Sequence, residues 1–213
     1  MKVRRIVTGE IYHVYSRSIA EYKIFNNDSE HLRMKEAAKY YKINKPLVKF
    51  SQRECKSMEK PVIVQRGVKE LVQIICYCIM PTHVHFVLKQ LIDKGISVFM
   101  GNLLNSYSRY FNIKHNRKGH LWEERFKEVL VKTDEQLLHL TRYIHLNPVT
   151  AYIVNKPEDW KWSSYLEYVS DNKDGICKYD NIVDIKPEEY KEFVENRISY
   201  QRELAKIKDI TLE

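Results

Sequence analysis

The stretch from Leu71 to Lys89, LVQIICYCIMPTHVHFVLK, decides the fold of this chain. It contains two runs of strand length, Leu71–Met80 and His83–Lys89, and Pro81 interrupts the chain between them. The first run is continuously apolar, and the second is rich in β-branched and aromatic residues. We therefore expect a strand, a tight turn and a second strand that returns beside the first.

Upstream of this hairpin, the segment Ile11–Ser18 (IYHVYSRS) alternates in the manner of a strand. A period of two places His13, Tyr15 and Arg17 on one face of that strand. Asp28–Tyr41 lacks Gly and Pro, which indicates a helix with Asn27 or Asp28 as its N-cap.

Downstream of the hairpin the spacing predicts a helix after Gly95, a strand within Leu121–Lys132 and a helix over Thr133–Asn147 that ends before Pro148. The first of these helices carries a core stripe of Met100, Leu104, Tyr107 and Phe111. Three further segments are predicted: a polar connection over residues 45–60, an edge strand at Pro61–Gln65 and an amphipathic terminal helix over Glu188–Lys208. This order is typical of an α+β fold with a largely antiparallel sheet.

The composition indicates a globular protein with a substantial core. The chain has 213 residues, of which 44% are hydrophobic and 12% aromatic, with only 6 Gly and 6 Pro. These values exclude disordered, collagen-like and low-complexity chains. No apolar run is long enough for a signal peptide or a membrane span, so we expect cytoplasmic residence and no membrane partner. The four scattered cysteines are expected to be reduced.

The positive charge is concentrated in one window of the sequence. The chain carries a formal charge of +8, and residues 101–132 hold seven basic and three acidic side chains, a net +4. Aromatic residues alternate with the basic ones there, as suits a surface for nucleic acid. The other interpretation is a charged helix end whose aromatics belong to the core.

Two histidines one residue apart are the first sign of chemistry. On a strand, His83 and His85 point to the same face and can chelate one divalent ion, although an isolated pair of this kind is also typical of a solvated face. In the helix after Thr133, the residues His139, Tyr143 and Asn147 lie along one face. If that face crosses the histidine pair, Asn147 can offer an amide oxygen and Tyr143 a phenol.

Two segments then carry a resemblance to a known family. CIMPTHVHFVLK, followed about sixty residues later by LTRYIHLNPVTAYIV, resembles the paired motifs of the single-tyrosine HUH transposases, in particular the REP-associated tyrosine transposases. The segments YHVYSRSIAEYKIF, GHLWEERFKEVLV and WKWSSY are similar to that family as well. The resemblance covers roughly residues 5–170, so we expect a transposase domain at 1–170 and a C-terminal helical extension at 171–213.

The resemblance implies a ferredoxin-like antiparallel sheet with helices packed on it. It also implies that His83 and His85 bind Mg²⁺ or Mn²⁺, that Tyr143 is the nucleophile and that Asn147 completes the metal site. Asn147 is shorter than the Gln of some relatives, which makes the metal geometry at this position an open question. Arg17 and Arg125 are the candidate residues for DNA binding.

The implied activity is cleavage and rejoining of single-stranded, hairpin-forming DNA through a 5′-phosphotyrosine. Three alternatives stay open: a DNA-binding regulator without turnover, a relaxase or replication-initiator nuclease, and a zinc hydrolase. The last is disfavoured because no Glu or Asp adjoins the histidine pair. The sequence leaves the choice between monomer and homodimer, and the DNA target, undetermined.

Overall fold

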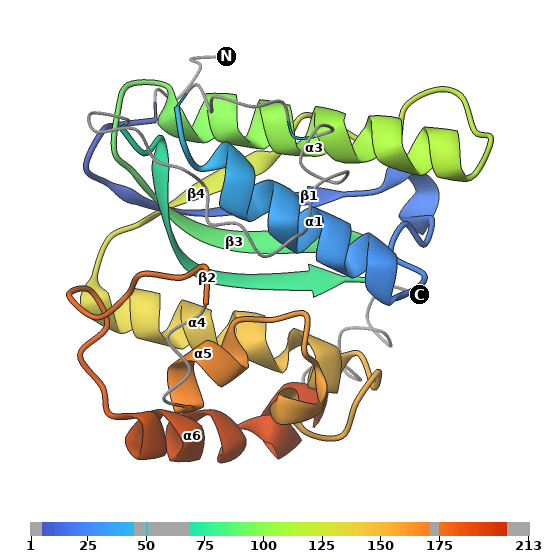
Figure 1. Cartoon of the computed structure of the whole chain (residues 1–213). Helices are drawn as coiled ribbons and strands as arrows, with labels where there is room; N and C mark the ends of the chain where they lie inside the picture. Colours follow the sequence, from blue (N-terminus) through green and yellow to red (C-terminus); the bar gives the residue numbers. More distant parts are fainter. Residues whose placement is uncertain (1–5, 45–49, 51–68, 171–174, 204–213) are drawn as a thin grey trace.

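The fold is a four-stranded antiparallel sheet between two helical layers (Figure 1). It is seen in a computed structural model, which describes residues 6–44, 50, 69–170 and 175–203. The strands are β1 (Ile11–Arg17), β2 (Val72–Met80), β3 (His83–Gln90) and β4 (Lys127–Val131). The α-helices are α1 (Asp28–Tyr41), α3 (Gly95–Lys114), α4 (Asp134–Thr150), α5 (Tyr165–Val169) and α6 (Pro187–Glu195). Short 3₁₀ turns lie at Ile19–Glu21 and Pro157–Asp159.

The strand order β2-β3-β1-β4 with antiparallel neighbours is the ferredoxin-like arrangement, which confirms the expected fold class. Helices α1 and α3 cover one face of the sheet, and α4 lies on the opposite face with α5 and α6 behind it (Figure 1). No helix in the described ranges is both long enough and apolar enough to span a membrane.

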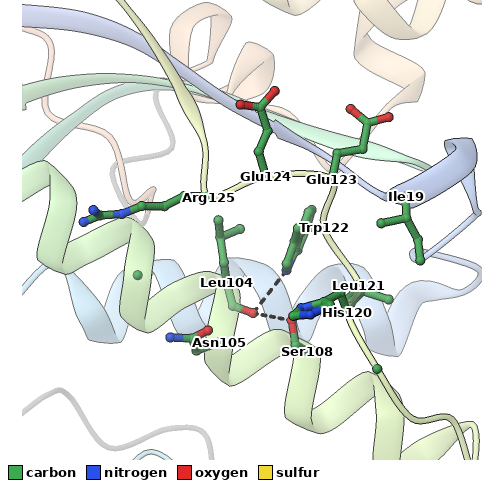
Figure 2. Close-up of a pocket in the computed structure, with 12 residues that line it drawn as sticks. Ile19, Leu104, Asn105, Ser108, His120, Leu121, Trp122, Glu123, Glu124 and Arg125 are labelled. Atoms are coloured by element: carbon green, nitrogen blue, oxygen red, sulfur yellow. Dashed lines mark hydrogen bonds between the residues drawn. The ribbon is translucent and has the colours of Figure 1, made fainter. Parts of the chain in front are cut away.

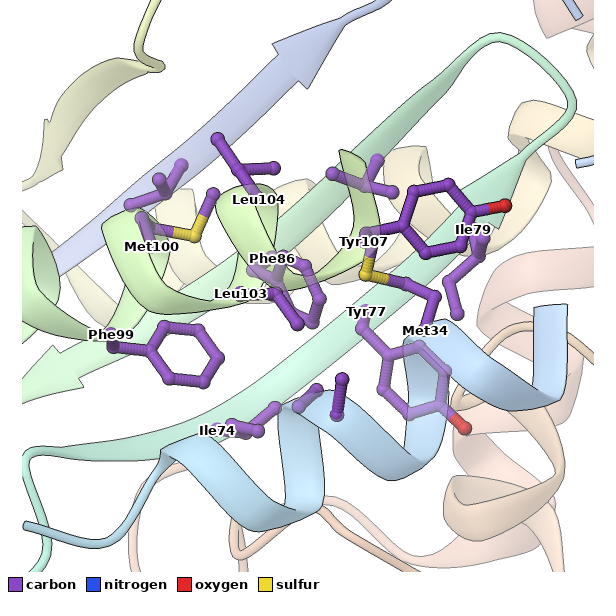
Figure 3. Packing of buried hydrophobic residues seen from close by; sticks show 14 of the residues in the cluster. Met34, Ile74, Tyr77, Ile79, Phe86, Phe99, Met100, Leu103, Leu104 and Tyr107 are labelled. Carbon is purple, nitrogen blue, oxygen red and sulfur yellow. The ribbon is translucent and has the colours of Figure 1, made fainter. Parts of the chain in front are cut away.

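The layer under α1 and α3 is built from alternate residues of the strands. Tyr12 and Val14 of β1 and Val84 and Phe86 of β3 are buried there, as the period of two predicts. Figure 3 shows side chains of α1 and α3 packed against side chains of β2 and β3 in this layer. The predicted stripe of α3 is buried in this layer: Met100, Leu104, Tyr107 and Phe111.

Strand β2 contributes to both layers because its register shifts once. Ile74 pairs with Leu88 and Cys76 with Val87, so Ile75 is an extra residue between them. A bulge of this kind bends the strand and changes the phase of its side chains. Ile75, Cys76 and Cys78 are therefore buried on the α4 side as part of the second layer, and both cysteines are free thiols.

Helix α4 begins where predicted but ends later. The Thr133 hydroxyl accepts a hydrogen bond from the backbone N–H of Gln136 at 3.1 Å, as an N-cap does. The prediction that the helix ends before Pro148 is wrong, because α4 continues to Thr150. Proline removes one N–H from the helix, but Val149 is buried in the second layer and Ala151 N–H still bonds to the Asn147 carbonyl.

The prediction of a strand within Leu121–Lys132 is confirmed by β4, which spans Lys127–Val131. Trp122 lies before this strand, where it forms an isolated bridge with Ser18 and its indole N–H donates a hydrogen bond to the Leu104 carbonyl of α3. The terminal helix is interrupted after α6 by a turn at Asn196 and Arg197, and residues 198–203 are helical again. The predicted edge strand Pro61–Gln65 and most of the connection 45–60 lie outside the described residues.

Helix α6 belongs to the second layer. Tyr190 and Val194 are fully buried against it, next to Tyr165 and Tyr168 of α5. The division into a domain at 1–170 and a C-terminal helical extension at 171–213 remains a prediction. In the structure, the described residues on its C-terminal side help to pack α4 against the sheet.

Candidate active site

Strand β3 presents the two predicted histidines to the α4 side of the sheet. His85 is only 4% exposed, and its ring centroid lies 4.9 Å from that of His83. The Thr82 hydroxyl oxygen lies 2.9 Å from His83 Nδ1 and forms a hydrogen bond with it. The His85 Nε2 atom is buried and has no hydrogen-bond partner among the described residues. An orphaned buried nitrogen beside a second imidazole is typical of a site that receives a ligand.

A third histidine, from β1, supports this pair. His13 Nε2 lies 3.0 Å from His85 Nδ1, and the two rings are stacked with centroids 5.2 Å apart. The contact is diagonal, because Tyr15 is the residue directly opposite His85 in the strand register. The alternation of β1 predicted the face on which His13 lies. It could not predict the strand that pairs with β1, so this contact was missed.

Helix α4 brings Tyr143 to the same place. The Tyr143 ring meets the His85 ring edge-on, with centroids 6.3 Å apart, and 43% of the tyrosine is exposed to solvent. Burial of the remainder raises the pKa of Tyr143, and the charge of Arg17 partly opposes that rise. The phenol is therefore accessible, protonated at neutral pH and within reach of a cation.

Asn147 follows one turn later on α4 and is half-buried. Its Nδ2 atom is buried and lacks a hydrogen-bond partner among the described residues. Rotating the amide by 180° exchanges its oxygen and nitrogen, so the same position can offer an oxygen to a ligand. His139, one turn before Tyr143, instead packs against Phe193 of α6 with ring centroids 5.6 Å apart. Of the polar face of α4, Tyr143 therefore contacts His85 of the site, whereas His139 contacts α6.

The imidazoles of the site are neutral at physiological pH. Burial lowers the pKa of His13 and of His83 to about 4, and Arg17 adds to the effect on His83. Burial also holds the pKa of His85 well below its usual value, with smaller effects from His83 and His13. Neutral imidazoles keep a lone pair, which is the form that binds metal.

These residues fit a divalent metal ion on two observations. Two buried polar atoms, His85 Nε2 and Asn147 Nδ2, are without partners, and the imidazoles are in their ligating form. The described part of the chain contains no group of three or more His, Cys, Asp or Glu side chains that could hold a metal ion. A metal here therefore needs the Asn147 amide and oxygens from outside the protein to complete its coordination.

The two arginines predicted to bind DNA lie in different places. Arg17 is opposite His83 in the strand register, and its charge influences both histidines of β3 and Tyr143. Arg125 lines a separate pocket between α3 and residues 119–125, where its guanidinium lies 5.3 Å from the centre of the Phe126 ring (Figure 2).

A buried polar cluster behind Tyr143 fixes the orientation of α4. His145 is fully buried, with Nδ1 2.7 Å from the Tyr190 hydroxyl and Nε2 2.8 Å from Ser164 Oγ. The Sγ atom of Cys76 on β2 lies 3.4 Å from the same Nε2. Burial lowers the pKa of His145 to about 3, so this imidazole is neutral. Its bonds tie α4 to β2 and α6, and the sequence contained no sign of them.

Comparison with known proteins shows what this chain is similar to. Residues 44–147 match the family model described as "Transposase IS200 like". A putative REP-associated tyrosine transposase of Haemophilus influenzae is 29% identical over 102 residues, which cover 43% of this chain and 57% of the relative. The chain thus matches little more than half the length of that curated relative.

A solved structure of a REP-associated tyrosine transposase bound to a REP hairpin has the same fold, with a TM-score of 0.54. The match covers 87% of this chain and 94% of the other at 16% identity. The family model spans both the β3 histidines and the α4 tyrosine, and the fold brings these motifs together. Residues 44–147 are therefore similar to the IS200-like transposases, and the chain has the fold of a REP-associated tyrosine transposase.

Proposed function

We propose that this protein is a DNA endonuclease and strand transferase that cleaves single-stranded, hairpin-forming DNA with Tyr143 as its nucleophile. The observation that carries the proposal is the meeting of Tyr143 of α4 with His85 of β3, at 6.3 Å between ring centroids. The family match and the hairpin-bound neighbour support the same substrate class.

The reaction conserves the phosphodiester bond energy. The Tyr143 oxygen attacks the scissile phosphorus and loses its proton to solvent, forming a P–O bond while the bond to the 3′-oxygen breaks. The products are a 5′-phosphotyrosine and a free 3′-hydroxyl. Attack on the phosphotyrosine by a 3′-hydroxyl reverses the step and rejoins DNA. Arg17 favours the deprotonated phenol, because its charge lowers the pKa of Tyr143.

His83, His85 and Asn147 are the proposed ligands for Mg²⁺ or Mn²⁺. When bound, such an ion would polarise the scissile phosphate and neutralise part of its charge. His13 holds His85 through the 3.0 Å contact at Nδ1, and His85 Nε2 has no hydrogen-bond partner among the described residues. Imidazole ligands favour Mn²⁺ over Mg²⁺, so Mn²⁺ is the better probe of the site.

DNA contacts are proposed for Arg17 and Arg125. Arg17 lies beside the histidines, and Arg125 lies in the basic window of residues 101–132. Both are exposed, so each can reach a phosphate group. A regulator that only binds DNA would use the same surface, and the experiment below separates the two functions.

The test is covalent adduct formation with labelled single-stranded DNA that contains hairpin repeats from the sequence flanking the gene. The wild-type protein should form a metal-dependent adduct that survives a denaturing gel and maps to Tyr143 by mass spectrometry. Tyr143→Phe should bind the DNA but form no adduct. Tyr152→Phe is the matched control, because Tyr152 is an exposed tyrosine just after the same helix and should leave the adduct unchanged.

The alternatives give different outcomes. An adduct formed by Tyr143→Phe would refute this tyrosine as the nucleophile. Tight binding by the wild-type protein without any adduct, with Mg²⁺ or with Mn²⁺, would favour the regulator.

A further inference from the structure

A pocket separate from the histidine site lies between α3 and residues 119–125. Its volume is about 760 Å³, within the range of small-ligand sites. Figure 2 shows Trp122 pointing toward α3 on one side, with Asn105 and Ser108 of α3 on the other. Trp122 Nε1–H and the Ser108 hydroxyl both donate to the Leu104 carbonyl, at 3.2 and 2.8 Å. The walls of the pocket are thus held in place by the protein itself.

A glycine in the middle of α3 leaves the pocket open. Gly101 lines it, and a Cβ added at this residue would have no heavy atom within 4 Å. Glycine inside a helix destabilises it by about 0.5–1 kcal/mol relative to alanine. No described part of the protein needs this residue to be small. Gly101 therefore leaves open a space beside α3 that a larger side chain would occupy.

The polar groups of the pocket suit a nucleotide. The guanidinium of Arg125 is exposed, and the Asn105 amide has no hydrogen-bond partner in the described part of the chain. Glu124 is neutralised by Lys127, with 2.9 Å between Oε1 and Nζ. In Figure 2 the carboxylates of Glu123 and Glu124 point away from α3. An aromatic wall, an amide and one cation can bind a base together with its phosphate.

The pocket lies close to the proposed site of cleavage. Residues 121–123 run beside residues 17–19: Leu121 O accepts from Ile19 N at 3.1 Å, and Glu123 N donates to Arg17 O at 3.0 Å. Arg17 is in turn opposite His83. Two strand spacings, ~10 Å in the plane of the sheet, thus separate the backbone at the rim of the pocket from the backbone of His83. The pocket lies on the α3 face of the sheet, and the histidine side chains lie on the α4 face. A DNA strand at Tyr143 needs only to cross this edge of the sheet to reach Trp122.

We propose that this pocket binds one unpaired nucleobase of the single-stranded DNA whose scissile phosphate lies at Tyr143. The base packs beside Trp122 over Gly101, Asn105 reads its polar edge, and Arg125 binds the adjoining phosphate. The inference rests on the proposed function, and it assigns to this pocket a part of the DNA specificity.

The test measures affinity by fluorescence anisotropy for a DNA hairpin with unpaired flanks and for the same hairpin with abasic flanks. The wild-type protein should bind the abasic DNA about 5- to 150-fold more weakly, as expected for the loss of one stacked base. In the Gly101→Leu variant the leucine side chain fills the pocket. This variant should therefore bind the intact DNA with the weak affinity that the wild-type protein has for the abasic DNA. It should show no further loss with the abasic DNA.

Three controls make the test specific. Gly101→Leu and Gly101→Ala should melt at or above the wild-type temperature, because both residues favour a helix more than glycine does. Gly101→Ala adds one carbon and should show a smaller loss of binding. Val98→Leu adds a methylene at an exposed position of the same helix outside the pocket and should bind both DNAs like the wild type.

The outcomes separate this inference from the proposed function. If the wild-type protein forms the Tyr143 adduct but binds intact and abasic flanks equally, the pocket assignment is overturned and the nuclease stands. The pocket assignment would also be overturned if the loss of affinity from Gly101→Leu and the loss from abasic flanks multiply when the two are combined. The two changes would then act at different places. If the wild-type protein binds no hairpin DNA, both proposals fail.

Discussion

Replacing His13 by alanine should weaken divalent-metal binding without unfolding the protein. His13 Nε2 forms the hydrogen bond to His85 Nδ1 at 3.0 Å, and His85 Nε2 is the orphaned atom assigned to the metal. For Nε2 of His85 to keep its lone pair, the proton of that ring must lie on Nδ1 and be donated to His13. Without His13, the ring loses both its orientation and the partner for that proton.

The size of the effect follows from this contact. Partners that orient a metal-binding histidine typically contribute 10- to 100-fold to metal affinity, or about 1.4–2.7 kcal/mol. His85 is 4% exposed, so an unpaired Nδ1–H also destabilises the fold by about 1–3 kcal/mol. His13→Gln should recover part of both losses, because its terminal amide can reach the place of the lost Nε2. His139→Ala is the matched control, since that imidazole packs on Phe193 instead of the site.

The assay is calorimetric titration with Mn²⁺ in the absence of DNA, together with thermal unfolding of each variant. Binding by His13→Ala within about twofold of wild type, with binding abolished by His85→Ala, would refute the role given to His13. Loss of binding in His139→Ala would refute the placement of the site itself.

Three further predictions concern stability. The free energy of unfolding should fall as the pH drops from about 6.5 to 4. His13 and His83 have a pKa of about 4 in the folded protein, so they bind protons more readily in the unfolded chain. Each histidine should contribute on the order of 2–3 kcal/mol to this loss, which urea titrations at several pH values would measure. A flat profile over this range would contradict their burial. His145→Ala should destabilise the protein by about 3–5 kcal/mol, because it leaves the Tyr190 and Ser164 hydroxyls unpaired. In the same denaturation assay, Tyr190→Phe should destabilise it by about 1–2 kcal/mol. Gly95→Ala should destabilise it severely, since the new Cβ would lie 2.2 Å from the Leu71 carbonyl oxygen, and a normal melting temperature would exclude that close contact.

Much of the local structure could be read from the sequence. The period of two in residues 83–89 predicted that both histidines share a face, because that phase depends only on the strand backbone. Asn27 and Thr133 cap their helices as expected, since capping involves residues three positions apart. The error at Pro148 has a physical cause, because packing against another layer overrides a local signal.

The position of the catalytic candidates along the chain was also determined by the sequence, through the motifs around His83 and Tyr143. Their meeting in space was decided by the tertiary structure. A strand's period identifies a face but not the neighbour that covers it, so only the packing of α4 on the sheet brings Tyr143 to His85. Likewise, only the pairing of β1 with β3 brings His13 to the same ring, and only the approach of residues 119–125 to α3 forms a pocket over Gly101. These contacts join segments far apart in the chain, and their geometry is set by the packing of the layers rather than by any local pattern.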